Sequence, residues 1–253
     1  MKHLTLLLTL LGGALLGGVA CADPLRIATG GHYPPYIYDP MTDQTRGFDK
    51  DLMDEICTRG DFECTWVDLP MGDIFQALAR GDVDVVTGGF GYSVDRDALV
   101  DFTCPYMSDG ENNGTFIGTR PDVDLITARI ATLDQSLYQT AMVQADRDVR
   151  PYPSEAAALD ALLAGDVDVA FGSHNMESLA SGRDGLYNLG EYPTFSKGTV
   201  LGVSEDAPTL RHTLDTLLAD MSTDGTLGQL QERWFDHNQG DVIARCLDLN
   251  ALT

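Results

Sequence analysis

A thirteen-residue segment occurs twice in this chain and constrains the fold more than any other feature. Residues 77–89 read ALARGDVDVVTGG and residues 161–173 read ALLAGDVDVAFGS, with eight of the thirteen positions identical. In each copy an Ala- and Leu-rich helical segment ends at a glycine, which suits a left-handed C-terminal cap, and a Val-rich run follows that is typical of a buried strand. Ligands in open α/β sheets bind beyond the carboxyl ends of strands. We therefore expect two α/β lobes with a ligand between them, although helix–Gly–strand units occur in any α/β protein.

The remaining sequence predicts further elements of the same class. Ser136 and Ser154 are candidate helix N-caps, and Asp224-Gly225 is a turn signal between two closing helices. Apolar periodicity predicts strands at residues 25–29, 64–67 and 126–132, and helices at residues 48–59, 72–80, 154–164, 209–221 and 227–235.

The N-terminus has the layout of a secretory signal peptide. Lys2 supplies a positive charge, residues 4–16 form an apolar run, and Ala20-Cys21-Ala22 places small residues where a signal peptidase reads them. We expect residues 1–22 to be removed. A membrane anchor and a lipoprotein attached through Cys21 are the alternatives, but Gly18 stands where a lipid-attachment box has a branched apolar residue. No later segment is long and apolar enough to span a bilayer.

Four cysteines follow the predicted signal peptide, and an even number in an exported chain suggests disulfides. Cys57 and Cys64 are close in sequence and form the first predicted pair, which leaves Cys104 and Cys246 as the second. The second bridge would tie the C-terminal segment to the body of the protein. Free buried thiols are the alternative, and a zinc site is disfavoured because the cysteines form no paired C-x-x-C units.

The chain is strongly acidic, with a formal net charge of −23. This charge argues against nucleic acid and anionic membrane surfaces as partners. It says nothing about the ligand, because the sign of the potential inside a cleft is local.

An ordered set of short motifs runs through the chain, and together they resemble the family 3 periplasmic solute-binding proteins, which include the lysine/arginine/ornithine- and histidine-binding proteins. The resemblance covers nearly all of the chain after residue 22. Each motif is weak alone, and the ordered set is specific. The motifs are Tyr33-Pro34-Pro35-Tyr36, Gly47-Phe48-Asp49, Cys57-x6-Cys64, Asp95-Arg96, Val100-Asp101-Phe102, Pro105-Tyr106, residues 164–168, Asp224-Gly225-Thr226 and Trp234-Phe235.

The resemblance implies a two-lobed α/β periplasmic-binding-protein fold of type II, in which two hinge strands join lobes that close over a ligand. It places the crossings near residues 108–112 and 193–199. Lobe 1 would then comprise residues 23–109 and 197–253, and lobe 2 residues 110–196. The resemblance also implies a monomer without cofactor or metal that captures an amino acid or a related carboxylate in the periplasm for an inner-membrane ABC permease.

Arg96 is the predicted carboxylate-binding residue. An amino-acid site needs a cation for the carboxylate, an anion for the ammonium group and aromatic walls. By the resemblance, Arg96 stands where the family's carboxylate-binding arginine stands, and a guanidinium can hold a carboxylate through two parallel hydrogen bonds. From the residues alone, a surface arginine beside Asp95 and Asp97 is the alternative.

The resemblance assigns the other ligand contacts by position. The backbone N–H groups of a glycine-containing loop would face the carboxylate, and Ser93 could replace a hydroxyl that the family usually carries where Gly91 stands. Tyr33 and Met71 fall at wall positions, whereas Tyr36 is expected to be structural. The full set of expected ligand-binding residues is Tyr33, Met71, Gly89, Phe90, Gly91, Ser93, Arg96, Ser136 and Ser173.

The sharpest departure from the family is Ser173, where many members have an Asp that binds the ligand's ammonium group. Leu137 stands where a Thr often helps, and Gly30 where an Asp often contacts basic ligand side chains. An ammonium group buried without a carboxylate costs several kcal/mol. Either another acid serves, with Asp134 and Glu177 as candidates, or the ligand has no ordinary α-ammonium group.

Two other functions compete with transport. Some proteins of this fold are periplasmic dehydratases acting on prephenate or arogenate, with a general acid one turn after the second-lobe strand. Here that position is Met176, next to Glu177, and the accompanying Thr-Asp is Gly172-Ser173. A partner of a separate receptor is the third possibility. His32 and His174 map to the expected cleft, but a metal site would lack a third ligand. We expect a binding protein and not an enzyme.

Overall fold

The structure is a computed structural model that describes residues 24–39, 44–108, 113–181, 183–194, 196, 198–236, 238, 243 and 246. The predicted signal peptide, residues 1–22, and its Cys21 lie outside the described residues. Within the described part of the chain, no helix has the length and apolar character needed to cross a membrane.

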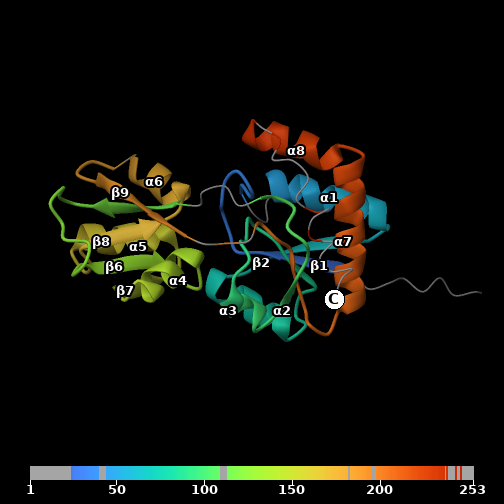
Figure 1. Cartoon of the computed structure of the whole chain (residues 1–253), viewed down its shortest axis with the longest axis horizontal. Coiled ribbons are helices and arrows are strands. Elements are labelled where there is room, and N and C mark those ends of the chain that lie inside the picture. The colour runs from blue at the N-terminus through green and yellow to red at the C-terminus, as the bar shows by residue number, and fades with distance from the viewer. Residues whose placement is uncertain are drawn as a thin grey trace, which may run out of the picture.

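A five-stranded sheet, of which Figure 1 labels β1 and β2, forms the centre of the first lobe, with the strand order β2-β1-β3-β10-β4. Strand β1 runs parallel to β2 and β3, whereas β10 runs antiparallel to β3 and β4. The strands are β1 (Leu25–Thr29), β2 (Cys64–Asp68), β3 (Val85–Val86), β4 (Asp101–Phe102) and β10 (Gly202–Val203).

The second lobe repeats this topology, with the order β7-β6-β8-β5-β9. Here β6 runs parallel to β7 and β8, and β5 runs antiparallel to β8 and β9. The equivalent strand orders confirm the prediction of two α/β lobes. The strands are β5 (Asn113–Gly118), β6 (Arg129–Leu133), β7 (Asp148–Tyr152), β8 (Val169–Gly172) and β9 (Tyr187–Pro193).

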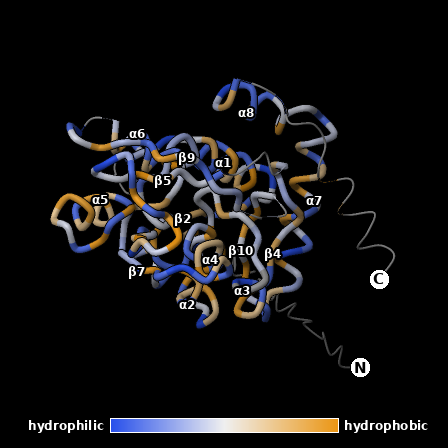
Figure 2. Tube along the Cα trace, turned by 60° about the vertical axis from the view of Figure 1, so that its left-hand side comes forward, coloured by the Kyte–Doolittle hydropathy of each residue, from blue (hydrophilic) through white to orange (hydrophobic). Residues whose placement is uncertain are grey.

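Helices cover each sheet, and most of their apolar positions are buried against it. In Figure 2, α5 and α7 carry both hydrophobic and hydrophilic positions, and the buried positions of α7 include Leu214, Leu218 and Met221. The first lobe contains α1 (Phe48–Gly60), the 3-10 turn η1 (Met71–Asp73), α2 (Ile74–Ala79), α3 (Val94–Asp97), α7 (Pro208–Thr223) and α8 (Thr226–Phe235). The second lobe contains α4 (Leu137–Gln144), α5 (Glu155–Ala164) and α6 (His174–Ser181).

The chain passes between the two sheets twice, once between β4 and β5 and once between β9 and β10 (Figure 1). Isolated bridges join Thr199 to Gly91 and to Met107 on the first-lobe side. The predicted lobe boundaries at residues 109/110 and 196/197 stay predictions, because residues 109–112, 195 and 197 lie outside the described residues.

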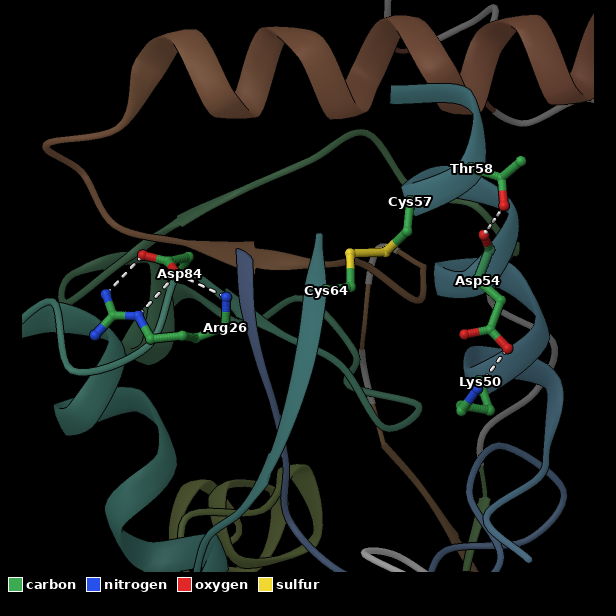
Figure 3. The surroundings of a disulfide bond; sticks show 7 residues. All are labelled: Arg26, Lys50, Asp54, Cys57, Thr58, Cys64 and Asp84. Atoms are coloured by element: carbon green, nitrogen blue, oxygen red, sulfur yellow. Dashed lines mark hydrogen bonds and ion pairs between the residues drawn. A yellow bond between two sulfur atoms is a disulfide. The ribbon is translucent and has the colours of Figure 1, made fainter. Parts of the chain in front are cut away.

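The sequence repeat corresponds to one structural device that each lobe uses once. In the first lobe, Arg26 of β1 donates through Nε and Nη2 to both carboxylate oxygens of Asp84, at 2.9 and 2.8 Å (Figure 3). In the second lobe, Arg129 of β6 donates in the same way to Asp168, at 3.0 and 2.9 Å. The last aspartate of each Gly-Asp-Val-Asp segment therefore fixes the strand that follows it to the parallel neighbour of that strand, β3 to β1 and β8 to β6.

Both predicted disulfides are confirmed. Cys57 at the end of α1 is bonded to Cys64 at the start of β2, and Figure 3 shows this bridge beside the sheet. Cys104 is bonded to Cys246, which is 142 positions further along the chain. The longer bridge ties the C-terminal segment to the first lobe.

Two predicted elements differ in their bounds from the sequence pattern. The strand predicted from residue 126 begins at Arg129, because the carboxylate of Asp124 accepts from the Ile126 N–H and the Thr127 hydroxyl and holds these residues in a turn. The helix predicted at residues 72–80 is divided into η1 and α2. The predicted N-caps are confirmed, since the Ser136 and Ser154 hydroxyls accept from the N–H groups of Gln139 and Ala157.

Candidate ligand-binding site between the lobes

Arg96 is a buried cation at the boundary between the two lobes. Arg96 belongs to the short helix α3, and it is 8% exposed. Nη1 donates to the Gly91 carbonyl at 2.9 Å in its own lobe, and Nη2 donates to the Gln135 carbonyl of the second lobe at 2.7 Å. The alternative of a surface arginine is therefore wrong.

The guanidinium of Arg96 has aromatic neighbours instead of an acidic one. Its carbon lies 4.8 Å from the ring centroid of Phe75 and 5.5 Å from that of Phe90. Among the side chains that the structure describes, no carboxylate forms an ion pair with it. Burial lowers the pKa of Arg96 to about 10, which records the cost of holding this charge away from water. An anion beside Arg96 would offset that cost.

The loop after β3 is positioned by a buried carboxylate. Asp49, in the first turn of α1, accepts at Oδ2 from the Thr87 hydroxyl at 2.8 Å and from the N–H groups of Gly88 and Gly89, each at 2.7 Å. At Oδ1 it accepts from the Tyr106 hydroxyl at 2.9 Å. Burial raises the pKa of Asp49, against the opposing effect of these hydrogen bonds. The Gly89 N–H, which was expected to face a carboxylate, donates to Asp49 in this structure.

Aromatic and sulfur-containing side chains border the site on the first-lobe side. Tyr33 is half-buried, and its ring stacks on Tyr36 at a centroid distance of 5.7 Å. Tyr36 also packs against Phe48 and Phe235, which agrees with a structural role. Met71 and Phe90 are buried in the same apolar cluster. A Cβ added at Gly30 would lie 3.0 Å from Met71 Sδ and 3.5 Å from Phe90, so a longer side chain at residue 30 would displace these walls.

Ser173 lies at the end of β8 in the second lobe, above a buried acid that the sequence analysis missed. Glu155 is 5% exposed, and its Oε1 accepts from the Ser173 N–H at 2.8 Å. Its Oε2 accepts from the Ser173 hydroxyl at 3.1 Å and from Asn175 Nδ2 at 2.9 Å. The sequence analysis did not single out Glu155, because the first turn of α5 and Ser173 are 18 positions apart and only the fold brings them together.

The two remaining predicted serines use their hydroxyl groups locally. Ser136 Oγ donates to the Leu133 carbonyl at 2.6 Å and accepts from the Gln139 N–H at 3.1 Å. Ser93 Oγ accepts from the Arg96 N–H at 3.3 Å. Both serines therefore position helix ends beside the site.

Several polar contacts between described residues cross from one lobe to the other. Besides the bond from Arg96 to the Gln135 carbonyl, Gln135 Nε2 donates to the Gly72 carbonyl at 2.6 Å. His174 Nε2 lies 2.7 Å from the Pro34 carbonyl, and the His174 ring is 5.4 Å from that of Tyr33. Gln135 was not predicted from the sequence, although it directly precedes a predicted N-cap. In the structure it has a left-handed φ of 52°.

The histidines of the expected cleft have ordinary partners. His32 is exposed, accepts weakly from the Asp39 N–H at 3.4 Å and packs edge-on against Tyr38. Across the residues with described positions, no three His, Cys, Asp or Glu side chains gather as a metal site would require.

Comparison with known proteins assigns the chain to a family. The model of the bacterial extracellular solute-binding proteins, family 3, matches residues 25–237. This chain belongs to that family. A family 3 relative, the histidine-binding periplasmic protein of Salmonella typhimurium, is 25% identical over 259 residues, covering 93% of this chain and 98% of the relative. The lysine/arginine/ornithine-binding periplasmic protein of Escherichia coli is 24% identical over 258 residues, covering 94% and 98%.

A solved structure has a similar fold. The periplasmic His/Glu/Gln/Arg/opine family-binding protein from Silicibacter pomeroyi, determined in complex with lysine, has a TM-score of 0.73 and 25% sequence identity. The match covers 83% of this chain and 96% of the other. Both lobes are therefore included in the similarity.

Proposed function

We propose that this protein captures an amino acid or a related small carboxylate in the periplasm and delivers it to an inner-membrane ABC permease. The observation that carries the proposal is Arg96, a buried guanidinium at the lobe boundary without a carboxylate partner among the described side chains. A ligand carboxylate would supply the missing negative charge through charge-assisted hydrogen bonds. The names of the family 3 relatives support the same class of ligand.

The arrangement of the site suits capture by lobe closure. Tyr33, Met71 and Phe90 would provide the walls, Gly89 and Gly91 the close backbone approach, and Ser173 the second-lobe contact. Gln135 of the second lobe contacts both Arg96 and Gly72 of the first lobe, and these contacts form only when the two lobes lie close together. We propose that residues 23–109 with 197–253, and residues 110–196, move as the two bodies, and that the permease recognises the monomer in its closed form.

A dehydratase is not proposed, because the position of its general acid holds an apolar side chain. Met176 is fully buried in an apolar cluster of the second lobe. The adjacent Glu177 is exposed and accepts from Asn188 Nδ2 at 3.0 Å. Met176 has no acidic group, and the Glu177 carboxylate has no described contact with Arg96 or Ser173.

The test is a thermal-shift screen of the protein lacking residues 1–22 against the common L-amino acids and small di- and tricarboxylates. A ligand at 100 times its Kd should add about 2.7 kcal/mol to the free energy of unfolding. Arg96→Ala should abolish the shift, and Arg96→Lys should weaken binding by about tenfold or more, because an ammonium cannot reproduce the two-pronged donor geometry.

Arg80→Ala is the matched control, because Arg80 is an exposed arginine paired with Asp82. It should bind as the wild type does. A folded Arg96→Ala or Arg96→Lys protein that keeps the wild-type affinity would remove the carboxylate contact from the proposal. A wild-type protein that responds to none of these compounds would overturn the proposed ligand class.

A further inference from the structure

Glu155 is a buried acid beside the candidate site that the proposed function does not use. All three of its hydrogen bonds are accepted from donors: the Ser173 N–H, the Ser173 hydroxyl and Asn175 Nδ2. It lies in the first turn of the ten-residue helix α5, where the helix dipole favours a negative charge. Among the described side chains, no lysine, arginine or histidine forms an ion pair with it. The described partners of Glu155 are therefore all neutral donors, and none of them carries a positive charge.

The packing beneath Ser173 is built around this carboxylate. A Cβ added at Gly172 would lie 2.6 Å from Glu155 Oε1, so glycine at residue 172 is what leaves space for the acid. Ser173 Oγ donates to Glu155 and accepts from the Asn175 N–H at 3.0 Å. A hydroxyl oxygen has two lone pairs. The other lone pair is left for the Tyr33 hydroxyl, which also hydrogen-bonds Ser173, and a ligand donor would replace Tyr33 there.

The opposite charges of Arg96 and Glu155 reach the same two tyrosines. Burial, then the charges of Tyr138 and Glu155, raise the pKa of Tyr33 well above its ordinary value. Burial also raises the pKa of Tyr138, where Glu155 raises it further and Arg96 lowers it. Tyr33 and Tyr138 are thus electrostatically coupled to both Arg96 and Glu155, neither of which forms an ion pair among the described side chains.

We propose that Glu155 is the counter-charge for a positively charged amino group of the ligand, acting through the hydroxyl of Ser173. The inference rests on the proposed function and deepens it. The ligand is then a zwitterion, with its carboxylate at Arg96 and its amino group at Ser173. Glu155 is a positioning residue that polarises Ser173 Oγ, so that the O–H points to the acid and a lone pair points to the ligand.

Glu155 is better placed for this task than the two acids considered from the sequence. Asp134 is only half-buried and accepts from the adjacent Gln135 N–H at 3.0 Å. Glu177 is exposed and binds Asn188. Water screens charges at exposed positions, whereas a buried carboxylate acts through a low dielectric and binds a cation more strongly.

The decisive variant is Glu155→Gln, which preserves the shape and removes the charge. The probes are an L-amino acid that binds the wild type and its α-hydroxy acid analogue, which keeps the carboxylate and replaces the ammonium group by a hydroxyl. Affinities are measured by calorimetry. Glu155→Gln should lose about tenfold or more in affinity for the amino acid, the range of a charged hydrogen bond. Its affinity for the hydroxy acid should change much less.

Glu177→Gln is the matched control, since it removes one negative charge from the same lobe, and it should leave both affinities unchanged. If Glu155→Gln does not fold, Ser173→Ala provides the second test. It keeps the Asn175 side-chain bond to Glu155 and the Ser173 N–H, and it should show the same selective loss for the amino acid.

Four outcomes would contradict the inference. A folded Glu155→Gln protein with wild-type affinity for the amino acid, or one that loses affinity equally for both probes, would show that Glu155 only shapes the loop. A wild type that binds carboxylates but no amino acid would overturn this inference and leave carboxylate capture intact. A wild type that binds neither class would overturn the proposed function and this inference together.

Discussion

Gly89 adopts a left-handed φ of +71° with aromatic rings packed directly against its Cα. A Cβ at this position would lie 2.6 Å from Cδ2 of Tyr36 and 3.0 Å from Cε1 of Tyr33. Asp49 holds the Gly89 N–H, so the backbone cannot move away without losing this partly buried hydrogen bond. The residue type at position 89 therefore controls the placement of Tyr33, a predicted wall of the ligand site.

The Gly89→Ala variant should lose stability for two separable reasons. Gly81 has a similar φ of +74° but no atom within 4 Å of an added Cβ, so Gly81→Ala measures the backbone cost alone. We expect about 1 kcal/mol for Gly81→Ala and about 2–4 kcal/mol for Gly89→Ala in urea unfolding. Equal losses would show that the rings around Gly89 adjust freely.

The paired strands of each lobe depend on the Arg–Asp contact that the sequence repeat encodes. Hydrogen bonds from Arg129, first from its side chain and then from its backbone, lower the pKa of Asp168 to about 2. An aspartate in an unfolded chain has a pKa of about 3.9. Because the folded-state pKa is the lower of the two, the contact stabilises the fold fully above about pH 4, and this stabilisation is lost as the pH falls toward 2.

Asp168→Asn should therefore lower the free energy of unfolding at neutral pH, and this effect should shrink as the pH falls through 2. The side chains of Arg129 and Asp168 are 41% and 35% exposed, so solvent screening limits the expected loss to about 1 kcal/mol. Denaturant titrations of both proteins at several pH values measure the difference. Asp160→Asn is the control, because Asp160 forms a more exposed pair with Arg183. A loss for Asp168→Asn that is independent of pH would contradict the argument.

Other elements show why the repeat was recognisable and the rest of the site was not. The helix–Gly–Asp–strand unit is local, so both copies could be identified along the chain. Glu155 also lies in a predicted helix. Its partner Ser173 is 18 positions further along the chain, and the two meet only because the rest of α5 and strand β8 bring the chain back. Similarly, β6 begins later than the apolar pattern predicts, because hydrogen bonds to the Asp124 side chain hold Ile126 and Thr127 in a turn.

At the scale of the whole molecule, the two disulfides constrain the unfolded chain very differently. Cys57 and Cys64 are separated by 7 positions, and Cys104 and Cys246 by 142. The entropy removed from an unfolded chain increases with the length of the closed loop. The long bridge, which connects the C-terminal segment to the first lobe, should therefore contribute more to global stability.

The Cys104→Ala/Cys246→Ala double variant should accordingly lose more stability than Cys57→Ala/Cys64→Ala. The chain-entropy estimate is roughly 5 kcal/mol for the long loop and about 2–3 kcal/mol for the short one. Thermal and urea unfolding without reductant provide the comparison, with mass spectrometry to verify the remaining bridge. A larger loss for the short bridge would show that local packing, and not loop length, dominates.

The sequence by itself determined the α/β class, the two lobes and the cysteine pairs, and it predicted Arg96 as a ligand contact, because each depends on local periodicity, composition or an ordered set of motifs. Only the tertiary structure decided that Arg96 is buried, that Gln135 bridges the lobes and that Glu155 lies beneath Ser173. The reason is physical. Burial and charge compensation depend on which distant segments meet, and the energy of a charge depends on those neighbours and not on its place along the chain.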